Sequence, residues 1–306
     1  MNSRSGFSIS LLHPRFWLTW FLLGIFYLLT LLPTAALDNI GGKLGNVLAK
    51  INRKRFNVVL TNLRLCFPDL PAEQTKTMAK RHFQFLMRGL VHYGLIWWAS
   101  DDRLKKHLQF EGFDLIEKAR ADGKNVLILL SHCTGLDFAV AAISMQYASA
   151  GPYKPFDNAV VDYMISCGRQ RFDCEPFTRD EGFRPLLRLA GEGKVIIYLA
   201  DEDLGPEVSV FAPFFGVTKA TIPLLGKLAK SCNAEVLPCF SCYDLQQQKY
   251  RVKLFEPMLG FPTSDQDMDT LLMNQMIEQT LEDCPEQYFW TLKLFKTRPE
   301  GEASVY

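Results

Sequence analysis

The sequence has almost no excess charge of either sign, and it lacks the paired cysteine motifs of small secreted or metal-binding domains. Its 306 residues carry 34 Lys and Arg against 33 Asp and Glu, a formal net charge of +1. Such a chain has no strong positive field, so we expect no nucleic-acid partner. The eight cysteines do not follow the spacing of a disulfide framework, which predicts reduced thiols in a cytosol-facing domain. Internal repeats and low-complexity segments are also missing.

Metal-site patterns are equally sparse. Cys239-Phe-Ser-Cys242 is a Cys-x-x-Cys without a second half, so we interpret both cysteines as core residues rather than as a redox or zinc site. Asp201-Glu202-Asp203 offers three acids, but no histidine accompanies them. We predict no metal there. These acids either orient basic residues of a site or form a polar turn closed by Gly-Pro.

Long apolar runs are scarce, with one exception at residues 16–32. This stretch of 17 uncharged residues is at the short end for crossing a bilayer. Basic residues follow it, which by the positive-inside rule places the main body in the cytoplasm. A cleaved signal peptide is the alternative, but the run exceeds the usual apolar length and the preceding segment is weakly basic. We therefore expect a membrane anchor at 1–40 and a cytoplasm-facing domain at 41–306. The sequence leaves open whether the helix spans the bilayer or lies partly in its interface.

From residue 124 onward, apolar runs alternate with helical patterns. Expected strands are 126–131, 195–200, 235–242 and 250–255; expected helices are 44–65, 72–98, 137–147, 158–168, 182–191, 222–231 and 270–282. This alternation predicts an α/β fold with a mixed, largely parallel sheet flanked by helices on both faces. The N-terminal region is expected to be helical, with the anchoring helix at its start. Ligands in such folds bind near the carboxyl ends of strands.

His132 and Asp137 form the most informative pair. His132 directly follows the apolar run 126–131, and Asp137 begins the next helical pattern. With the histidine on the turn and the carboxylate in the first helical turn, we expect Asp137 to fix the imidazole tautomer and leave His132 as a general base. The alternative is a hydrogen-bonded histidine at a strand end and an aspartate that caps a helix.

Candidate anion ligands lie between and after these strand ends. Arg169, Arg171 and Arg179 suggest a phosphate or carboxylate ligand, because guanidinium groups bind such oxygens in a bidentate manner. Lys219 and Thr221 lie in what we interpret as a flexible turn before a helix, where they would face a headgroup. The alternatives are surface ion pairs for the arginines and a simple helix cap for Thr221.

At this point the residues resemble a known family. The pattern His132-x4-Asp137 resembles the signature of the glycerolipid acyltransferases, and the wider pattern resembles the late acyltransferases of lipid A biosynthesis in Gram-negative bacteria. The similarity covers nearly the whole chain, in segments 12–17, 62–68, 131–137, 162–163, 201–206, 219–223 and 285–298. Asp137 and Lys293, which follows Trp290 closely, resemble the myristoyl type, whereas segment 151–158 departs from it.

The resemblance implies an inner-membrane enzyme that moves an acyl chain from acyl carrier protein to a lipid A precursor bearing Kdo sugars. The acceptor would be the 3-hydroxyl of an acyl chain already present, and no cofactor is implied. His132 would take the hydroxyl proton, and N–H groups around Gly135 would stabilise the oxyanion. We expect direct transfer without an acyl-enzyme, because Cys133 and His132 are neighbours that point apart on an extended segment. The phosphate would meet the cations at 169, 171, 179 and 219, while Asp201 and Asp203 help to order the substrate site.

Three other functions remain open on the sequence. The acceptor could be a lysophospholipid or glycerol phosphate. A thioesterase would use the same base with water in place of the lipid hydroxyl. A catalytically silent, lipid-binding membrane protein would keep the fold without the reaction.

Overall fold

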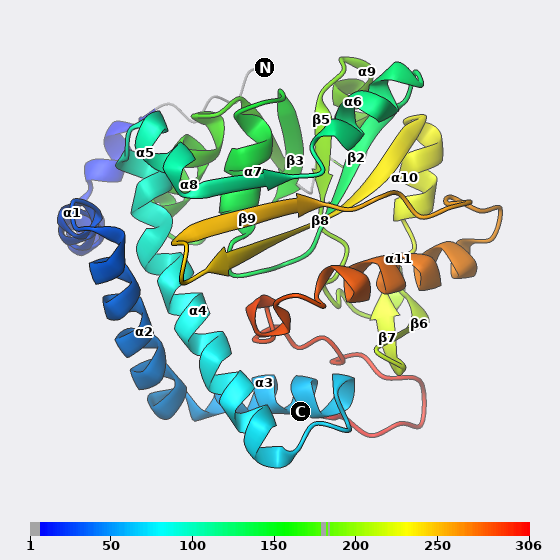
Figure 1. Cartoon of the computed structure of the whole chain (residues 1–306), viewed down its shortest axis with the longest axis horizontal. Coiled ribbons are helices and arrows are strands. Elements are labelled where there is room, and N and C mark those ends of the chain that lie inside the picture. Colours follow the sequence, from blue (N-terminus) through cyan, green and yellow to red (C-terminus); the bar gives the residue numbers. More distant parts are fainter. Residues whose placement is uncertain (1–6, 179–181, 183) are drawn as a thin grey trace.

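The computed structural model describes residues 7–178, 182 and 184–306 and is shown in Figure 1. Its centre is a seven-stranded sheet in the order β1-β9-β8-β2-β5-β3-β4, and a two-stranded hairpin, β6-β7, stands apart. The strands are β1 (Leu108–Glu111), β2 (Asn125–Leu130), β3 (Ser149–Tyr153), β4 (Cys174–Thr178), β5 (Val195–Tyr198), β6 (Val210–Phe214), β7 (Val217–Thr221), β8 (Ala234–Asp244) and β9 (Lys249–Leu254). Neighbouring strands are parallel except β8 and β9. The predicted mixed, largely parallel sheet is confirmed.

Both faces of the sheet are covered, which explains the uninterrupted apolar run in β2. Leu127 and Leu129 join a core cluster that includes α9, α10 and α11. Ile128 and Leu130 point the other way, into a cluster with α6 and α7. A parallel strand buried on two faces needs apolar residues at every position. The helices on these faces are α6 (Asp114–Ala121), α7 (Leu136–Ser144), α9 (Arg184–Gly191), α10 (Leu225–Ser231) and α11 (Gln266–Thr280).

The N-terminal region is helical, as predicted. It contains η1 (Ile9–Leu12), η2 (Pro14–Phe16), α1 (Trp17–Thr30), α2 (Thr34–Ile51), α3 (Arg53–Cys66), α4 (Ala72–Trp98) and α5 (Asp101–Lys106). Figure 1 shows α2 beside the long α4. Gly45 allows this approach, because a Cβ there would lie 2.4 Å from the carbonyl oxygen of Phe83. The helix expected at 44–65 is split at Asn52, whose side chain accepts from the N–H of Arg55 and starts α3.

Residues 16–32 form α1 and the turn that leads to Pro33. In the described ranges, none of the helices combines the length and the apolar character needed to cross a membrane. The sequence left open whether the anchor expected at 1–40 spans the bilayer or lies partly in its interface, and this finding does not support an anchoring helix that spans it. At the end of α4, Trp97 and Trp98 are half-buried and pack against α1, with 5.6 Å between the ring centroids of Phe26 and Trp97.

Several elements differ from the predictions. The strands β1, β3, β4, β6 and β7 were not expected, and 213–221 is a β-hairpin rather than a flexible turn. Thr221 ends β7, and the helix that it was expected to cap begins at Leu225. The remaining helix, α8 (Ala159–Gln170), begins after Asn158, whose side chain caps it. Two 3-10 turns, η4 (Pro206–Val208) and η5 (Pro285–Gln287), lie in the loops near the site.

Candidate active site

A cavity of about 710 Å³ opens at the carboxyl ends of the central strands, with His132 in its wall. Side chains of α4 form one side, among them Leu86, Leu90 and Tyr93. Phe289 and Leu292 from the C-terminal segment line the cavity as well. The volume is typical of a small-molecule site, and the lining is largely apolar. The cavity therefore suits a hydrocarbon chain more than a sugar or nucleotide.

The sheet topology brings His132 and Asp201 together. Since β2 and β5 are adjacent and parallel, the turns that follow them lie at the same edge of the sheet. Nδ1 of His132 lies 2.5 Å from Oδ1 of Asp201, and the backbone N–H of His132 donates to Oδ2 at 2.8 Å. A carboxylate accepts, so Nδ1 carries the proton and Nε2 is the basic nitrogen. The carboxylate of Glu202 lies 3.6 Å from Nε2.

The electrostatics of Asp201 fit an ionised partner for an imidazole. Its side chain is only 1% exposed. Burial raises its pKa, but the charge of His132 and the hydrogen bonds from its ring and backbone outweigh burial and leave the pKa of Asp201 below its ordinary value. Asp201 is thus equipped to orient His132 and to stabilise the imidazolium.

Asp137 has a different partner from the one predicted. Its Oδ1 accepts from Nε of Arg169 at 2.7 Å, and both residues line the cavity. Burial lowers the pKa of Arg169, but the adjacent Asp137 charge raises it above its ordinary value. The structure therefore gives Asp201 the orienting contact predicted for Asp137, and Asp137 fixes Arg169 at the cavity wall.

Cys133 is buried beside His132 and is a poor nucleophile. Burial raises the pKa of its thiol to about 12, so almost no thiolate is present at neutral pH. A buried, protonated thiol does not favour attack on a thioester.

A C-terminal segment, Cys284 to Trp290, closes over the turn that carries His132; we call it the closing segment. The N–H of Phe289 donates to the carbonyl of His132 at 3.0 Å, and the N–H of Thr134 donates to the carbonyl of Gln287 at 2.9 Å. The Gln287 side chain also holds both backbone groups of Tyr243 on β8. These bonds fix the turn that carries His132 between β8 and the closing segment.

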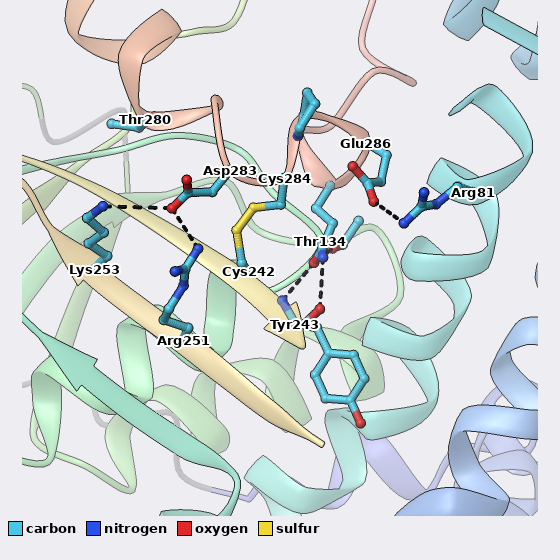
Figure 2. The surroundings of a disulfide bond; sticks show 12 residues. Arg81, Thr134, Cys242, Tyr243, Arg251, Lys253, Thr280, Asp283, Cys284 and Glu286 are labelled. Carbon is cyan, nitrogen blue, oxygen red and sulfur yellow. Dashed lines mark hydrogen bonds and ion pairs between the residues drawn. A yellow bond between two sulfur atoms is a disulfide. The ribbon is translucent and has the colours of Figure 1, made fainter. Parts of the chain in front are cut away.

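A disulfide between Cys242 and Cys284 fastens the start of the closing segment to β8, as Figure 2 shows. The expectation that all cysteines are reduced is thus wrong for this pair, because the cysteine that Cys242 meets lies far away in sequence. Cys239 and Cys242 are both buried, as predicted, and Cys239 is a free thiol. In Figure 2, ion pairs flank the disulfide, with Arg81 on Glu286 at 2.8 Å and Arg251 on Asp283 at 2.7 Å.

Several predicted ligands lie elsewhere. Arg171 binds the end of α4, where its guanidinium donates to the carbonyls of Ile96 and Ala99 at 2.7 and 2.5 Å. It satisfies helix-terminal carbonyls and does not line the cavity, so its assignment to substrate is wrong. Gly135 packs against β8, where a Cβ would lie 2.6 Å from Oγ of Ser241. Arg179 lies outside the described residues.

The remaining predicted residues are buried or structural. Asp203 accepts from the N–H and hydroxyl of Thr297 at 2.6 and 2.7 Å. Lys219 and Thr221 are fully buried in the hairpin, so the prediction that they face a lipid headgroup is wrong. The pattern suggested exposure because a Thr-Lys-Ala-Thr sequence looks polar, whereas β7 packs its Lys219 inward. Among the residues with a described structure, no cluster of His, Cys, Asp and Glu could hold a metal ion.

The sequence reasoning missed the closing segment and the α4 side chains as cavity walls. The only sequence signal for the closing segment was the family resemblance of residues 285–298, which does not indicate that this segment packs against the turn of His132. For α4, the apolar face was visible, but nothing distinguished a cavity wall from a packed core.

Comparison with known proteins matches residues 4–297 to the family of bacterial lipid A biosynthesis acyltransferases. A lipid A biosynthesis acyltransferase of Haemophilus influenzae is 35% identical over 97% of this chain and 93% of its own length. The lauroyltransferase of Escherichia coli is 30% identical over the whole of both chains. The myristoyltransferase of Escherichia coli is 29% identical over 98% of this chain and 93% of its own.

Proposed function

Because the chain belongs to the bacterial lipid A biosynthesis acyltransferase family, we propose that it transfers a fatty acyl chain, myristoyl first among the candidates, from acyl carrier protein to a hydroxyl of an acyl chain on a Kdo-bearing lipid A precursor. The observation that carries this proposal is that His132, which is paired with the buried Asp201, lines an apolar cavity. A base beside a space for hydrocarbon is what acyl transfer to a lipid hydroxyl requires.

In this reaction Nε2 of His132 removes the proton of the acceptor hydroxyl as its oxygen attacks the thioester carbonyl. Asp201 stabilises the resulting imidazolium through Nδ1. The imidazolium then returns the proton to the departing thiolate. Because the acceptor hydroxyl attacks the thioester directly, no acyl-enzyme forms. The base alone accounts for a rate factor of roughly 10² to 10⁴.

The oxyanion would be stabilised at the start of α7. Leu136 and Asp137, its first residues, line the cavity, and N–H groups at a helix N-terminus carry partial positive charge. Lys154 lines the cavity too, and Arg169 is the cation that Asp137 fixes in the same wall. We assign it to an anionic group of the acceptor, such as a lipid A phosphate.

The myristoyl assignment rests on the resemblance of Asp137 and of the segment after Trp290. Relatives of similar identity are named for lauroyl, palmitoleoyl and myristoyl transfer, so the choice among chain lengths falls to experiment. Acyl carrier proteins are acidic. Exposed basic residues on α3, such as Arg53, Lys54 and Arg64, would therefore speed the association of the carrier protein with this enzyme.

We also propose that the protein works at the inner membrane with its catalytic domain on the cytoplasmic side. The outward face of α1 supports contact with lipid, because Phe21, Leu22 and Leu28 are each more than half exposed. An apolar helix face of this kind suits the interface of a bilayer.

The test is mass spectrometry of reactions that contain purified protein, Kdo-bearing lipid A precursors and a panel of acyl-carrier thioesters. We expect one acyl-sized mass gain on the lipid, abolished by His132→Ala and retained by His13→Ala, which alters an exposed histidine outside the cavity. Lysophospholipid and glycerol phosphate serve as rival acceptors. A gain only on a rival acceptor, release of free fatty acid without transfer, or an intact thioester in every reaction would each refute the proposal.

A further inference from the structure

Lys219 is a buried charge that the reaction described above does not use. It lies on β7, and its exposed fraction is 0%. Lysine side chains normally keep their ammonium group in water, and a buried ammonium is costly unless opposite charge compensates it. A lysine in this position therefore requires an electrostatic reason.

The immediate surroundings of Lys219 supply little compensation. Its Nζ lies 3.5 Å from Oγ1 of Thr221 and 5.7 Å from the centroid of the Phe214 ring. Across the described ranges, no carboxylate oxygen lies within 4.0 Å of Nζ. The compensating charge must therefore act over a slightly longer distance, through a medium of low dielectric constant.

The fold places the acids after β5 against β7. Two consecutive residues connect these acids to β7. Thr297 donates hydrogen bonds to the side chain of Asp203, and Arg298 donates one to the carbonyl of Thr218, the residue before Lys219. Asp201, two residues before Asp203, is buried as well. The charges of Asp201 and Asp203 both favour the ammonium form of Lys219.

We propose that Lys219 is a positioning residue that acts through Asp201: its buried ammonium holds this carboxylate ionised against His132 and limits how strongly the carboxylate favours the protonated imidazole. The proposal rests on the proposed function only in that His132 is the base. It assigns Lys219 no contact with substrate.

The sign of the effect follows from Coulomb's law. An unopposed Asp201 attracts the proton on His132 and makes the imidazole harder to deprotonate. A cation behind Asp201 weakens that attraction, so more of the basic form of His132 is present near neutral pH. Loss of the Lys219 charge should therefore move the acidic limb of the activity profile to higher pH.

Lys219 is in the required charged state at neutral pH. Burial lowers its pKa to about 8, against the opposing effect of the two aspartates. The other titratable or charged groups near this cluster are Cys66 on α3, Glu278 on α11, Tyr288 of the closing segment, Glu202 beside His132, Arg298 at Thr218 and Tyr306. Burial raises the pKa of Cys66, Tyr288 and Glu278. The thiol of Cys66 and the phenol of Tyr288 therefore stay neutral near neutral pH.

The experiment compares Lys219→Met with wild-type protein by NMR titration of histidine labelled with ¹³C in its ring. His132→Asn identifies the His132 signal. We expect the pKa of His132 to rise by roughly one unit in Lys219→Met and the acidic limb of kcat/KM to move by the same amount, with kcat recovered at high pH. Lys219→Arg, which keeps the charge, should titrate like wild type; Lys219→Gln replaces the Met variant if the latter does not fold.

Lys296→Met is the matched control, because Lys296 is exposed and bonds the backbone carbonyl of Asp203. It should leave the titration of His132 unchanged. An unshifted His132 in folded Lys219→Met or Lys219→Gln overturns the proposal, whatever the activity. The titration needs no substrate, so a shift in a protein that fails to acylate any lipid would support this role for Lys219 while refuting the proposed function.

Discussion

Two carboxylates lie near the base, one close in sequence and one close in space, and they contact different partners. Asp137 follows His132 by five residues but pairs with Arg169. Asp201 is 69 residues away and meets Nδ1. A single substitution at each position separates the role that the sequence suggested from the role that the structure assigns.

Asp201→Asn should lower kcat by roughly 10² to 10⁴ with little change in KM, because an amide cannot stabilise the imidazolium and disturbs its tautomer. Steady-state kinetics with the acyl donor that the mass assay identifies provide the measurement.

Asp137→Asn should instead leave Arg169 without its charge partner in the cavity wall. We expect a smaller loss in kcat, a higher KM for the acceptor, and a free energy of unfolding lower by about 3–5 kcal/mol in urea titrations. If Asp137→Asn suppressed kcat as strongly as His132→Ala while Asp201→Asn did not, the assignment of the orienting role to Asp201 would be wrong.

Among the elements, α4 is joined to the closing segment by a buried histidine. Nδ1 of His82 donates to the carbonyl of Glu286 at 3.0 Å. Burial lowers the pKa of His82 from 6.5 to about 4, so the unfolded chain binds a proton more readily than the folded one. This contribution to stability is complete above pH 6.5 and is lost as the pH falls towards 4.

The free energy of unfolding should therefore fall by about 3 kcal/mol between pH 7 and pH 4 on account of His82. His82→Gln removes this titration and should flatten the curve, which urea unfolding at a series of pH values would reveal. His13→Gln, at an exposed site, is the control and should follow wild type. Parallel curves for His82→Gln and wild type would contradict the argument.

A second link between elements runs from α3 to the cavity. The amide nitrogen of Asn62 donates to the carbonyls of Trp290 and Leu292, each at 2.7 Å, and its oxygen accepts from the hydroxyl of Tyr306. Asn62 is fully buried. It thus holds the backbone on both sides of the point where the closing segment ends.

Asn62→Leu should lower the free energy of unfolding by about 1–3 kcal/mol for each carbonyl left unpaired. Since Leu292 lines the cavity, KM for the acyl donor should rise more than kcat falls. Asn57→Leu, at an exposed position of the same helix, is the matched control. Unchanged KM and stability in Asn62→Leu would show that the closing segment needs no support from α3.

The elements that could be predicted are those with a clear period or an unbroken apolar run. The helix α4 was predicted with the bounds that it has, and β2 and β5 were found because strands buried on two faces are apolar throughout. The strand β3 was missed because Ser-Ala-Gly-Pro-Tyr is short and contains breakers. The β6-β7 hairpin turns at Phe215 and Gly216, both with positive φ, and Phe-Gly lacks the Asn-Gly or Asp-Gly signal of such turns.

At the scale of the whole molecule, the site combines segments whose proximity no local pattern encodes. The sequence marked His132 and the acids at 201–203 as strand-end residues. It could not tell that β5 would pair with β2, which is what brings Asp201 to His132. Likewise, the sequence suggested that Lys219 is a surface cation, whereas its side chain on β7 is buried in the structure.

The position of α1 on the outside of the molecule leads to a prediction about membrane contact. Phe21 and Leu28 are 65% and 62% exposed, and each large apolar side chain inserted into lipid contributes about 1.5–3 kcal/mol. The double variant Phe21→Glu, Leu28→Glu should therefore bind vesicles of phosphatidylethanolamine and phosphatidylglycerol at least roughly tenfold more weakly, as measured by sedimentation.

Leu259→Glu is the control, because Leu259 is 96% exposed in the loop before α11. Equal vesicle binding by wild type and the double variant would exclude α1 as the lipid-contacting face.

The closing segment has a consequence for how the protein is made. It completes the turn of His132 from a part of the chain that is synthesised much later, after β8 and α11. While the ribosome is still adding these residues, the emerging polypeptide carries β2 and α4 with their apolar surfaces open, because the residues that cover them do not yet exist. Such intermediates aggregate readily. The nascent chain should therefore depend on a chaperone or on early capture by lipid, and the turn of His132 is assembled only after the closing segment has been made.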